Sequence, residues 1–164
     1  MSPPPRCCSG SMSEPPFDPS AVSPSARVLS MVVANDRREL ARIGERVERF
    51  ASECRLSADH AASLNLVLDE LVSNVIKYGY EDQGPHEIHV TVEVQRDLLT
   101  VSVEDDGKPF NPIEAPLPNV DLPIEERPIG GLGMLLIRSI ADDLHYRRER
   151  GRNIVTLKKR VDST

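Results

Sequence analysis

Residues 57–79 carry the strongest periodic pattern in the sequence. Apolar side chains recur there every three or four positions, at Leu64, Val67, Leu68, Leu71, Val72, Val75 and Ile76. Ser57 can cap the start of this run and Gly79 can stop it. The pattern predicts a long amphipathic helix, and such a helix is stable where a second layer covers its apolar face.

The other segments predict that second layer. A strand starts near Arg27 and stops at Asn35, and another amphipathic helix spans 36–53. The remaining expected elements are a hairpin of strands 87–94 and 98–104, a helix at 132–141, and a second hairpin of strands 143–149 and 153–159. Paired strands kept apart from grouped helices predict an α+β fold, a two-layer α/β sandwich with helices on one face of a mixed, mostly antiparallel sheet.

Two proline-rich segments lie outside these elements. Residues 1–26 are mostly Pro and Ser with few aliphatic side chains, which predicts a disordered leader. Six prolines between Asp105 and Gly131 exclude a helix interior or a central strand there, and loops of this length are usually functional or disordered. The folded domain is therefore expected at 27–160.

Composition and charge exclude several classes of protein. The 164 residues suffice for one domain, and the formal net charge of -6 provides no basic field for nucleic acid. No apolar stretch has the length of a membrane span or the pattern of a secretory signal. The three cysteines show no disulfide or metal-ligand spacing, which fits a reducing compartment. We therefore expect a cytoplasmic protein that contacts neither nucleic acid nor a membrane.

Glu70 and Asn74 are polar residues within the aliphatic pattern of the helix at 57–79. They lie one turn apart, about 40° around the helix axis, and share a stripe with Lys77. A carboxylate is a candidate general base, and an amide oxygen is a hard ligand that suits Mg²⁺. The same spacing also occurs on an ordinary solvated helix face, so spacing alone leaves both interpretations open.

Two glycine-containing motifs follow along the chain. Asp105 could read an exocyclic amine such as that of adenine, and Gly107 would let a flat ring approach the backbone, although a plain turn explains both residues as well. The sequence IGGLGM at 129–134 opens the third helix. Free N–H groups and the helix dipole favour an anion there, and a structural turn is the other interpretation.

The order of these motifs resembles that of a known family of nucleotide-binding domains. From near Arg27 to Lys159 the chain resembles the GHKL ATPase superfamily, which has the Bergerat ATP-binding fold, and within it the single-domain anti-sigma factor serine kinases. The segment ELVSNVIKY at 70–78 resembles the N box, DDGKPF at 105–110 the first glycine box, and GGLGM at 130–134 the second. The first box departs from many relatives at its second glycine, where this chain has Lys-Pro.

The resemblance implies a role for each matching residue. Asn74 would coordinate Mg²⁺, Asp105 would recognise the adenine amine, and Gly107 would support the ring. Glu70 would be the catalytic carboxylate that deprotonates an incoming Ser or Thr hydroxyl. The further cofactor-binding residues implied are Lys77, Gly131, Leu132, Gly133 and Met134. The loop at 107–130 would be the ATP lid.

By this resemblance we expect an ATP- and Mg²⁺-dependent serine/threonine protein kinase that acts as an anti-sigma factor. It would bind a sigma factor, phosphorylate a small anti-sigma factor antagonist, and form a homodimer. The alternative is a non-catalytic ATP-binding module that regulates by sequestering a partner protein. A sensor histidine kinase is disfavoured, because nothing N-terminal to Arg27 could form the helix hairpin that carries a phospho-accepting histidine.

Overall fold

The computed structural model describes residues 26–114 and 132–161. Its elements, in chain order, are β1 (Arg27–Ala34), α1 (Glu39–Glu53), α2 (Ala58–Tyr78), β2 (Glu87–Gln95), β3 (Leu98–Asp105), α3 (Leu132–Ile140), β4 (Asp143–Glu149) and β5 (Arg152–Arg160). Each expected helix and strand is present, with bounds close to those the sequence predicts. The leader up to residue 25 and residues 115–130 of the expected ATP lid lie outside the described part of the chain.

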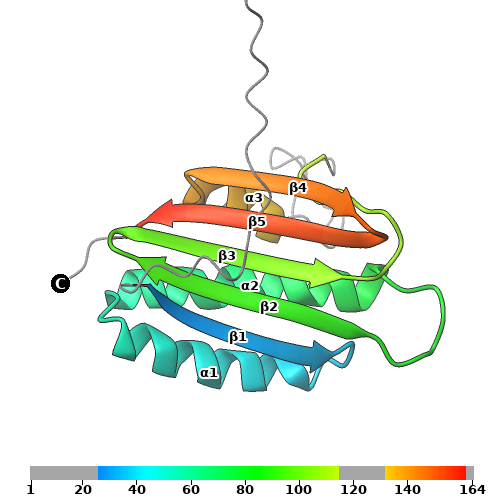
Figure 1. Cartoon of the computed structure of the whole chain (residues 1–164), viewed down its shortest axis with the longest axis horizontal. Coiled ribbons are helices and arrows are strands. Elements are labelled where there is room, and N and C mark those ends of the chain that lie inside the picture. The colour runs from blue at the N-terminus through cyan, green and yellow to red at the C-terminus, as the bar shows by residue number, and fades with distance from the viewer. Residues whose placement is uncertain (1–25, 115–131, 162–164) are drawn as a thin grey trace, which may run out of the picture.

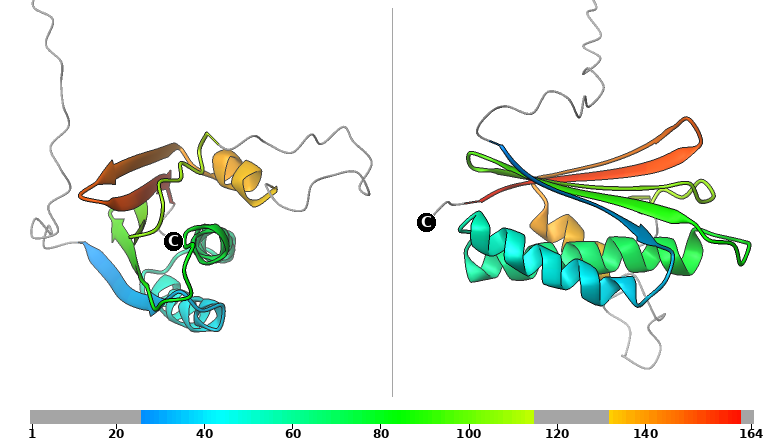
Figure 2. Two further views of the ribbon diagram at one scale, coloured as in Figure 1. Left: turned by 90° about the vertical axis from the view of Figure 1, so that its right-hand side faces the viewer. Right: turned by 60° about the horizontal axis from the view of Figure 1, so that its bottom comes forward.

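The described strands form one sheet in the order β1-β2-β3-β5-β4, and every neighbouring pair is antiparallel. Helices α1, α2 and α3 lie on one face of this sheet, behind it in Figure 1 and to one side in the turned views of Figure 2. The predicted α+β two-layer sandwich is confirmed. The described sheet is wholly antiparallel rather than mixed. Helices α1 and α2 together return the chain to the end of the sheet at which β1 stopped, so β2 runs back along β1 (Figure 1).

Helix α2 begins and ends where its flanking residues predict. Ser57 has an extended backbone, and its hydroxyl accepts a hydrogen bond from the His60 N–H at 3.2 Å. Gly79 follows the last helical residue and donates its N–H to the Val75 carbonyl at 2.8 Å. The φ of Gly79 is -72°, so this glycine is not needed for a left-handed backbone. A Cβ at residue 79 would instead lie 2.6 Å from the Val75 carbonyl oxygen, so lack of space against the preceding turn of α2 favours glycine here.

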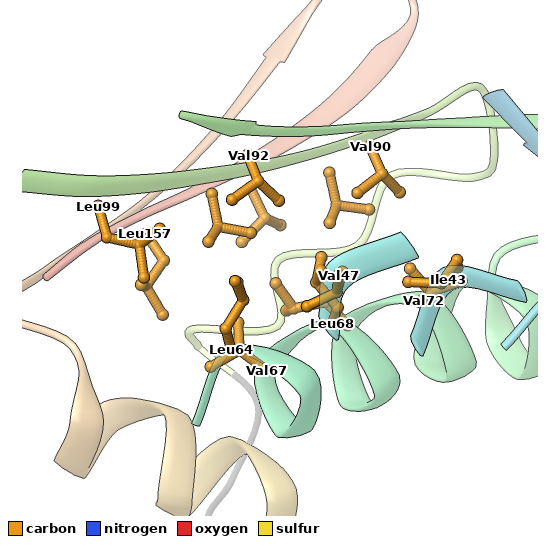
Figure 3. Packing of buried hydrophobic residues seen from close by; sticks show 14 of the residues in the cluster. Ile43, Val47, Leu64, Val67, Leu68, Val72, Val90, Val92, Leu99 and Leu157 are labelled. Atoms are coloured by element: carbon orange, nitrogen blue, oxygen red, sulfur yellow. The ribbon is translucent and has the colours of Figure 1, made fainter. Parts of the chain in front are cut away.

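The hydrophobic core lies between the sheet and the helices. Val90 and Val92 of β2 point toward Leu64 and Leu68 of α2, and each of the four is at most 1 % exposed (Figure 3). Burial of such aliphatic surface stabilises the fold by about 25 cal/mol per Å². Within the described residues, no helix combines the length and the apolarity that crossing a membrane requires.

The end of β3 and the start of β5 lie near the C-terminal end of α2. The alternation of β3 ends on Asp105 and that of β5 starts at Asn153, and these two residues are direct cross-strand partners, each 4 % exposed. The β4–β5 hairpin turns just beyond them through Arg150 and Gly151, whose positive φ values of 50° and 81° are typical of a two-residue type I′ turn. Two polar side chains, of Asp105 and Asn153, therefore occupy core-facing positions at the ends of two inner strands.

Candidate active site

A pocket open to solvent, of about 430 Å³ when the solvent at its mouth is included, lies between the C-terminal half of α2, the end of β3 and the start of β5. Its apolar wall includes Leu71, Val75, Val103, Phe110 and Val155. The polar residues that line it are Asn74, Asp105, Lys108 and Asn153. Small-molecule sites share this composition, because apolar surface holds a flat group and a few polar atoms fix its orientation. Two of the sequence-predicted site residues, Asn74 and Asp105, thus come together in one pocket.

Asp105 is the buried carboxylate of this pocket. Its Oδ1 accepts hydrogen bonds from the Gly107 N–H at 2.8 Å and from the Asn153 side-chain amide at 2.9 Å. Burial raises the pKa of the Asp105 carboxyl above its ordinary value, and the two hydrogen bonds hold that increase back. Within the described residues no hydrogen bond uses Oδ2, so this oxygen is available to a ligand.

Gly107 lets the segment after β3 meet the end of α2 closely. A Cβ at residue 107 would lie 2.5 Å from the Gly79 carbonyl oxygen and 2.8 Å from Asp105 Oδ1. The Lys108 N–H donates to the same Gly79 carbonyl at 2.8 Å. Gly107 is therefore required by lack of space beside the carboxylate, since its φ is not positive.

Glu70 lies one turn before Asn74 on α2 and contacts the first turn of α3. A Cβ built on Gly133 would overlap the carboxyl group of Glu70. A glycine of the second glycine motif therefore packs directly against the expected catalytic carboxylate. The backbone N–H groups that open α3 lie at the same junction, where the positive end of a helix favours an anion.

The other expected site residues are placed less directly. Lys77 is exposed on α2 and is not among the residues that line the pocket. The Met134 side chain is 5 % exposed and belongs to the hydrophobic core. Only the backbone of Met134 could therefore contact a ligand. Leu132 is the first residue of α3, and Gly131 lies outside the described residues. Their roles stay predictions.

Sequence reasoning missed the contribution of the β4–β5 hairpin. Asn153 lines the pocket and donates to Asp105. The arginine-rich composition of this hairpin is typical of a solvated face, but Arg148 donates to the Gly107 carbonyl at 3.1 Å. One signal was present in the sequence. Asn153 alternates with Val155 and Leu157, so it occupies a core-facing position where a polar side chain needs a partner.

His86 forms a bridge beside the pocket. Its Nε2 lies 2.9 Å from Asp82 Oδ1, its Nδ1 lies 3.2 Å from Asp106 Oδ1, and the Tyr80 ring stacks on it with 4.0 Å between centroids. The hydrogen bond with Asp82 is the main cause that raises the pKa of His86, and the same bond lowers the pKa of Asp82. Asp106 thus ties the loop after β3 to the loop after α2, next to Gly107.

The site fits an adenine nucleotide. An ionised carboxylate accepts hydrogen bonds and cannot donate them, so Asp105 Oδ2 suits a ring that presents an amine. The apolar wall suits the faces of such a ring. Gly107, expected to support the ring, is buried against the Gly79 carbonyl and is not among the residues that line the pocket. Glu70 and Asn74 follow along α2 on the same side, where phosphates attached to the base would extend toward the start of α3.

The whole arrangement is that of a known family. The profile of the histidine kinase-like ATPase domain matches residues 33–159, a span from β1 to β5 that contains all the pocket residues. The chain belongs to the histidine kinase-like ATPase domain family, and it is an ATP-binding domain.

Among individual proteins, the serine/threonine-protein kinase BtrW of Bordetella bronchiseptica is 29% identical over 111 residues, which cover 68% of this chain and 78% of that relative. The serine-protein kinase RsbW of Listeria innocua is 29% identical over 118 residues, which cover 66% and 72%. The RsbW of Bacillus mycoides is 26% identical over 113 residues, which cover 66% and 69%. Similar sequences thus extend over most of each of these relatives.

A solved structure shares the fold. The crystal structure of the RsbU and RsbW domains of a Mycobacterium tuberculosis protein superposes with a TM-score of 0.58 at 15% sequence identity. The match covers 82% of this chain and 32% of that longer one. At this identity the likeness concerns the α+β architecture alone.

Proposed function

We propose that this chain is an ATP- and Mg²⁺-dependent serine/threonine protein kinase that acts as an anti-sigma factor. The observation that carries the proposal is the Glu70 carboxyl, which sits at the junction of α2 and α3 one turn from the pocket residue Asn74. A carboxylate at that place can accept a proton from an incoming hydroxyl, which favours catalysis over simple sequestration. The names of the related serine-protein kinases support the same activity.

The nucleotide base is assigned to the pocket between α2 and the strand ends of β3 and β5. Asp105 accepts from the amine of adenine through Oδ2, and the apolar wall around Leu71 and Val155 covers the ring. The phosphates then lie toward the first turn of α3, where Gly133 and its neighbours present backbone N–H groups. Lys77, Gly131, Leu132 and Met134 keep the phosphate-side roles that the resemblance implies.

Mg²⁺ is assigned to the side-chain oxygen of Asn74. The described residues hold no cluster of three or more His, Cys, Asp or Glu side chains able to bind a metal, which fits an ion held by one protein oxygen and by phosphates. Bound Mg²⁺ would neutralise negative charge on the phosphates during transfer. Asn74 lines the pocket and lies on the same helix stripe as Glu70, so one helix positions both groups.

Glu70 acts as the general base. Its carboxylate accepts the proton of a serine or threonine hydroxyl as the oxygen of that hydroxyl forms its bond to the γ-phosphorus. The bond between the γ-phosphorus and the bridging oxygen breaks, and ADP leaves with that electron pair. Contact with Gly133 limits the positions that the Glu70 carboxyl can take.

The protein substrate is a small anti-sigma factor antagonist, and the regulated partner is a sigma factor. Both partners are what the resemblance to the anti-sigma factor serine kinases implies, and the names of the related serine kinases support a protein substrate. With these partners the protein would act in the cytoplasm, without direct contact to nucleic acid or membrane. By the same resemblance the chain forms a homodimer, which sedimentation at several concentrations tests.

Calorimetric titration with Mg-ATP, followed by a transfer assay with an antagonist protein, tests this function. We expect Glu70→Gln to bind ATP with the affinity of the unaltered protein and to transfer phosphate roughly 10²–10⁴ times more slowly. We expect Asp105→Asn to bind ATP weakly, because an amide in place of the carboxylate removes the charged acceptor. Failure of the unaltered protein to bind ATP would overturn the proposal.

A further inference from the structure

A chain of hydrogen bonds runs from the β4–β5 hairpin to the Asp105 carboxylate. The side-chain oxygen of Asn153 accepts from Arg148 Nη1 at 2.7 Å and from the Tyr146 hydroxyl at 2.9 Å. The side-chain nitrogen of Asn153 donates to Asp105 Oδ1 at 2.9 Å and to the Lys108 carbonyl at 2.9 Å. Both acceptor sites and both N–H groups of this amide are therefore in use.

Arg148 fixes the direction of that amide. A guanidinium group has donors and no acceptor, so the oxygen of the Asn153 amide must face it. The nitrogen must then face Asp105. The reversed amide would set N–H against N–H on one side and a carbonyl against a carboxylate on the other. Because Asn153 is 4 % exposed, water does not compensate such a reversal.

The orientation of the amide decides what Asp105 offers to a ligand. Donation from Asn153 and from the Gly107 N–H occupies Oδ1 and favours the ionised carboxylate. Among the described residues Oδ2 makes no hydrogen bond, so it is left as an acceptor for a ligand in the pocket that Asp105 lines. Arg148 adds a second contact, since its Nη1 also donates to the Gly107 carbonyl at 3.1 Å and so holds the loop beside the carboxylate.

We propose that Tyr146, Arg148 and Asn153 are positioning residues that set the base selectivity of the nucleotide site. They hold Asp105 as an acceptor for an exocyclic amine, so the site takes a 6-aminopurine and rejects a 6-oxopurine, whose oxygen would face the carboxylate. The inference rests on the proposed function, because it takes the pocket to be the site of the nucleotide base.

The test compares the affinities of ATP and ITP, which differ in the group at position 6 of the purine. Arg148→Met and Tyr146→Phe each remove donors to Asn153, and both positions are only partly buried or exposed, so the fold should persist. We expect each variant to lower the ratio of ATP affinity to ITP affinity by roughly 3- to 10-fold, as loss of a hydrogen bond near a charged group predicts. Arg147→Met is the matched control, because Arg147 is the adjacent residue on β4 and its ion pair is with Glu149 on the surface.

A second readout is the pH dependence of ATP binding. The hydrogen bond from Asn153 and the positive charge of Arg148 each lower the pKa of Asp105. The weakening of ATP binding as the pH falls should therefore begin at a higher pH in Asn153→Leu, which loses the first, and in Arg148→Met, which loses the second. If Asn153→Leu does not fold, Arg148→Met and Tyr146→Phe decide alone. A wild-type affinity ratio and pH profile in both of them would overturn the inference, as would an equal loss for ATP and ITP. If the unaltered protein bound neither nucleotide, the proposed function itself would fall.

Discussion

Gly133 packs against the carboxyl group of Glu70 with no room between them for a methyl group. The glycine belongs to the first turn of α3 and the carboxylate to the middle of α2, so this contact joins the second glycine motif to the proposed base. Glu70 can therefore take this position only because residue 133, on a different helix, has no side chain.

Gly133→Ala should separate catalysis from stability. The φ of Gly133 is not positive, so alanine suits the helical backbone, and the group that must move is the end of a flexible side chain. We expect a free energy of unfolding equal to or slightly above that of the unaltered protein, and phosphate transfer slower by on the order of 100-fold, because the base is misplaced. Denaturant unfolding and a transfer assay on the same preparation measure both effects.

Gly44→Ala is the matched control for that variant. A Cβ at Gly44 of α1 would lie 3.9 Å from Asn65 Oδ1, which is an ordinary contact distance. The substitution should raise the free energy of unfolding by about 0.5–1 kcal/mol and leave transfer unchanged. Equal transfer rates for the alanine variants of Gly133 and Gly44 would show that the contact with Glu70 has no part in catalysis.

Gly107→Ala should damage both the fold and the site. The methyl group would meet the Gly79 carbonyl, which is backbone and cannot swing aside, and it would crowd Asp105 Oδ1. We expect a loss of roughly 1–3 kcal/mol in the free energy of unfolding, as for other overpacked sites, together with weaker ATP binding. Chemical denaturation and calorimetry test the pair of effects. An unaltered ATP affinity in a folded variant would argue against close approach of the nucleotide at Gly107.

His86 should make stability depend on pH. Its pKa is raised in the folded state, so its contribution is complete below its unfolded pKa of 6.5 and is lost as the pH rises through the folded value. The lowered pKa of Asp82 means that the partner loses its contribution only at more acidic pH. The destabilisation caused by His86→Gln should therefore be larger near about pH 6 than near about pH 9.

Urea unfolding at a series of pH values measures this difference. His145→Gln is the control, because His145 pairs with Asp143 on an exposed strand where an ion pair stabilises little. A destabilisation by His86→Gln that stayed constant across the pH range would contradict this account. It would show that His86 stabilises the fold through its stacking on Tyr80 and not through its charge.

Local chemistry explains why the elements could be predicted from the sequence. The N-cap hydroxyl of Ser57 acts on the next turn of the helix, and the alternation of Ile88, Val90 and Val92 directly sets the buried face of β2. The same locality limits the prediction for Gly79. The sequence indicates that a glycine ends α2, but it does not show that the Gly79 carbonyl accepts a hydrogen bond from the Lys108 N–H of a distant segment.

The site was predictable where one segment contains its own motif. Asp105 and Gly107 are two residues apart and contact each other, so their pattern is visible in the sequence. Asn153 and Arg148 act on the same carboxylate and loop from a hairpin much further along the chain, and their contact depends on the register of β3 with β5. An arginine-rich hairpin resembles a solvated face until that register is known.

The most direct test of the central claim is the intact mass of a small antagonist partner, measured before and after Mg-ATP is added to its complex with this protein. The account predicts that the partner gains the mass of one phosphate with the unaltered protein and gains none with Glu70→Gln, although both bind ATP. A partner that stays bound without any change in mass would contradict the account, and it would show instead an ATP-dependent module that acts by sequestration.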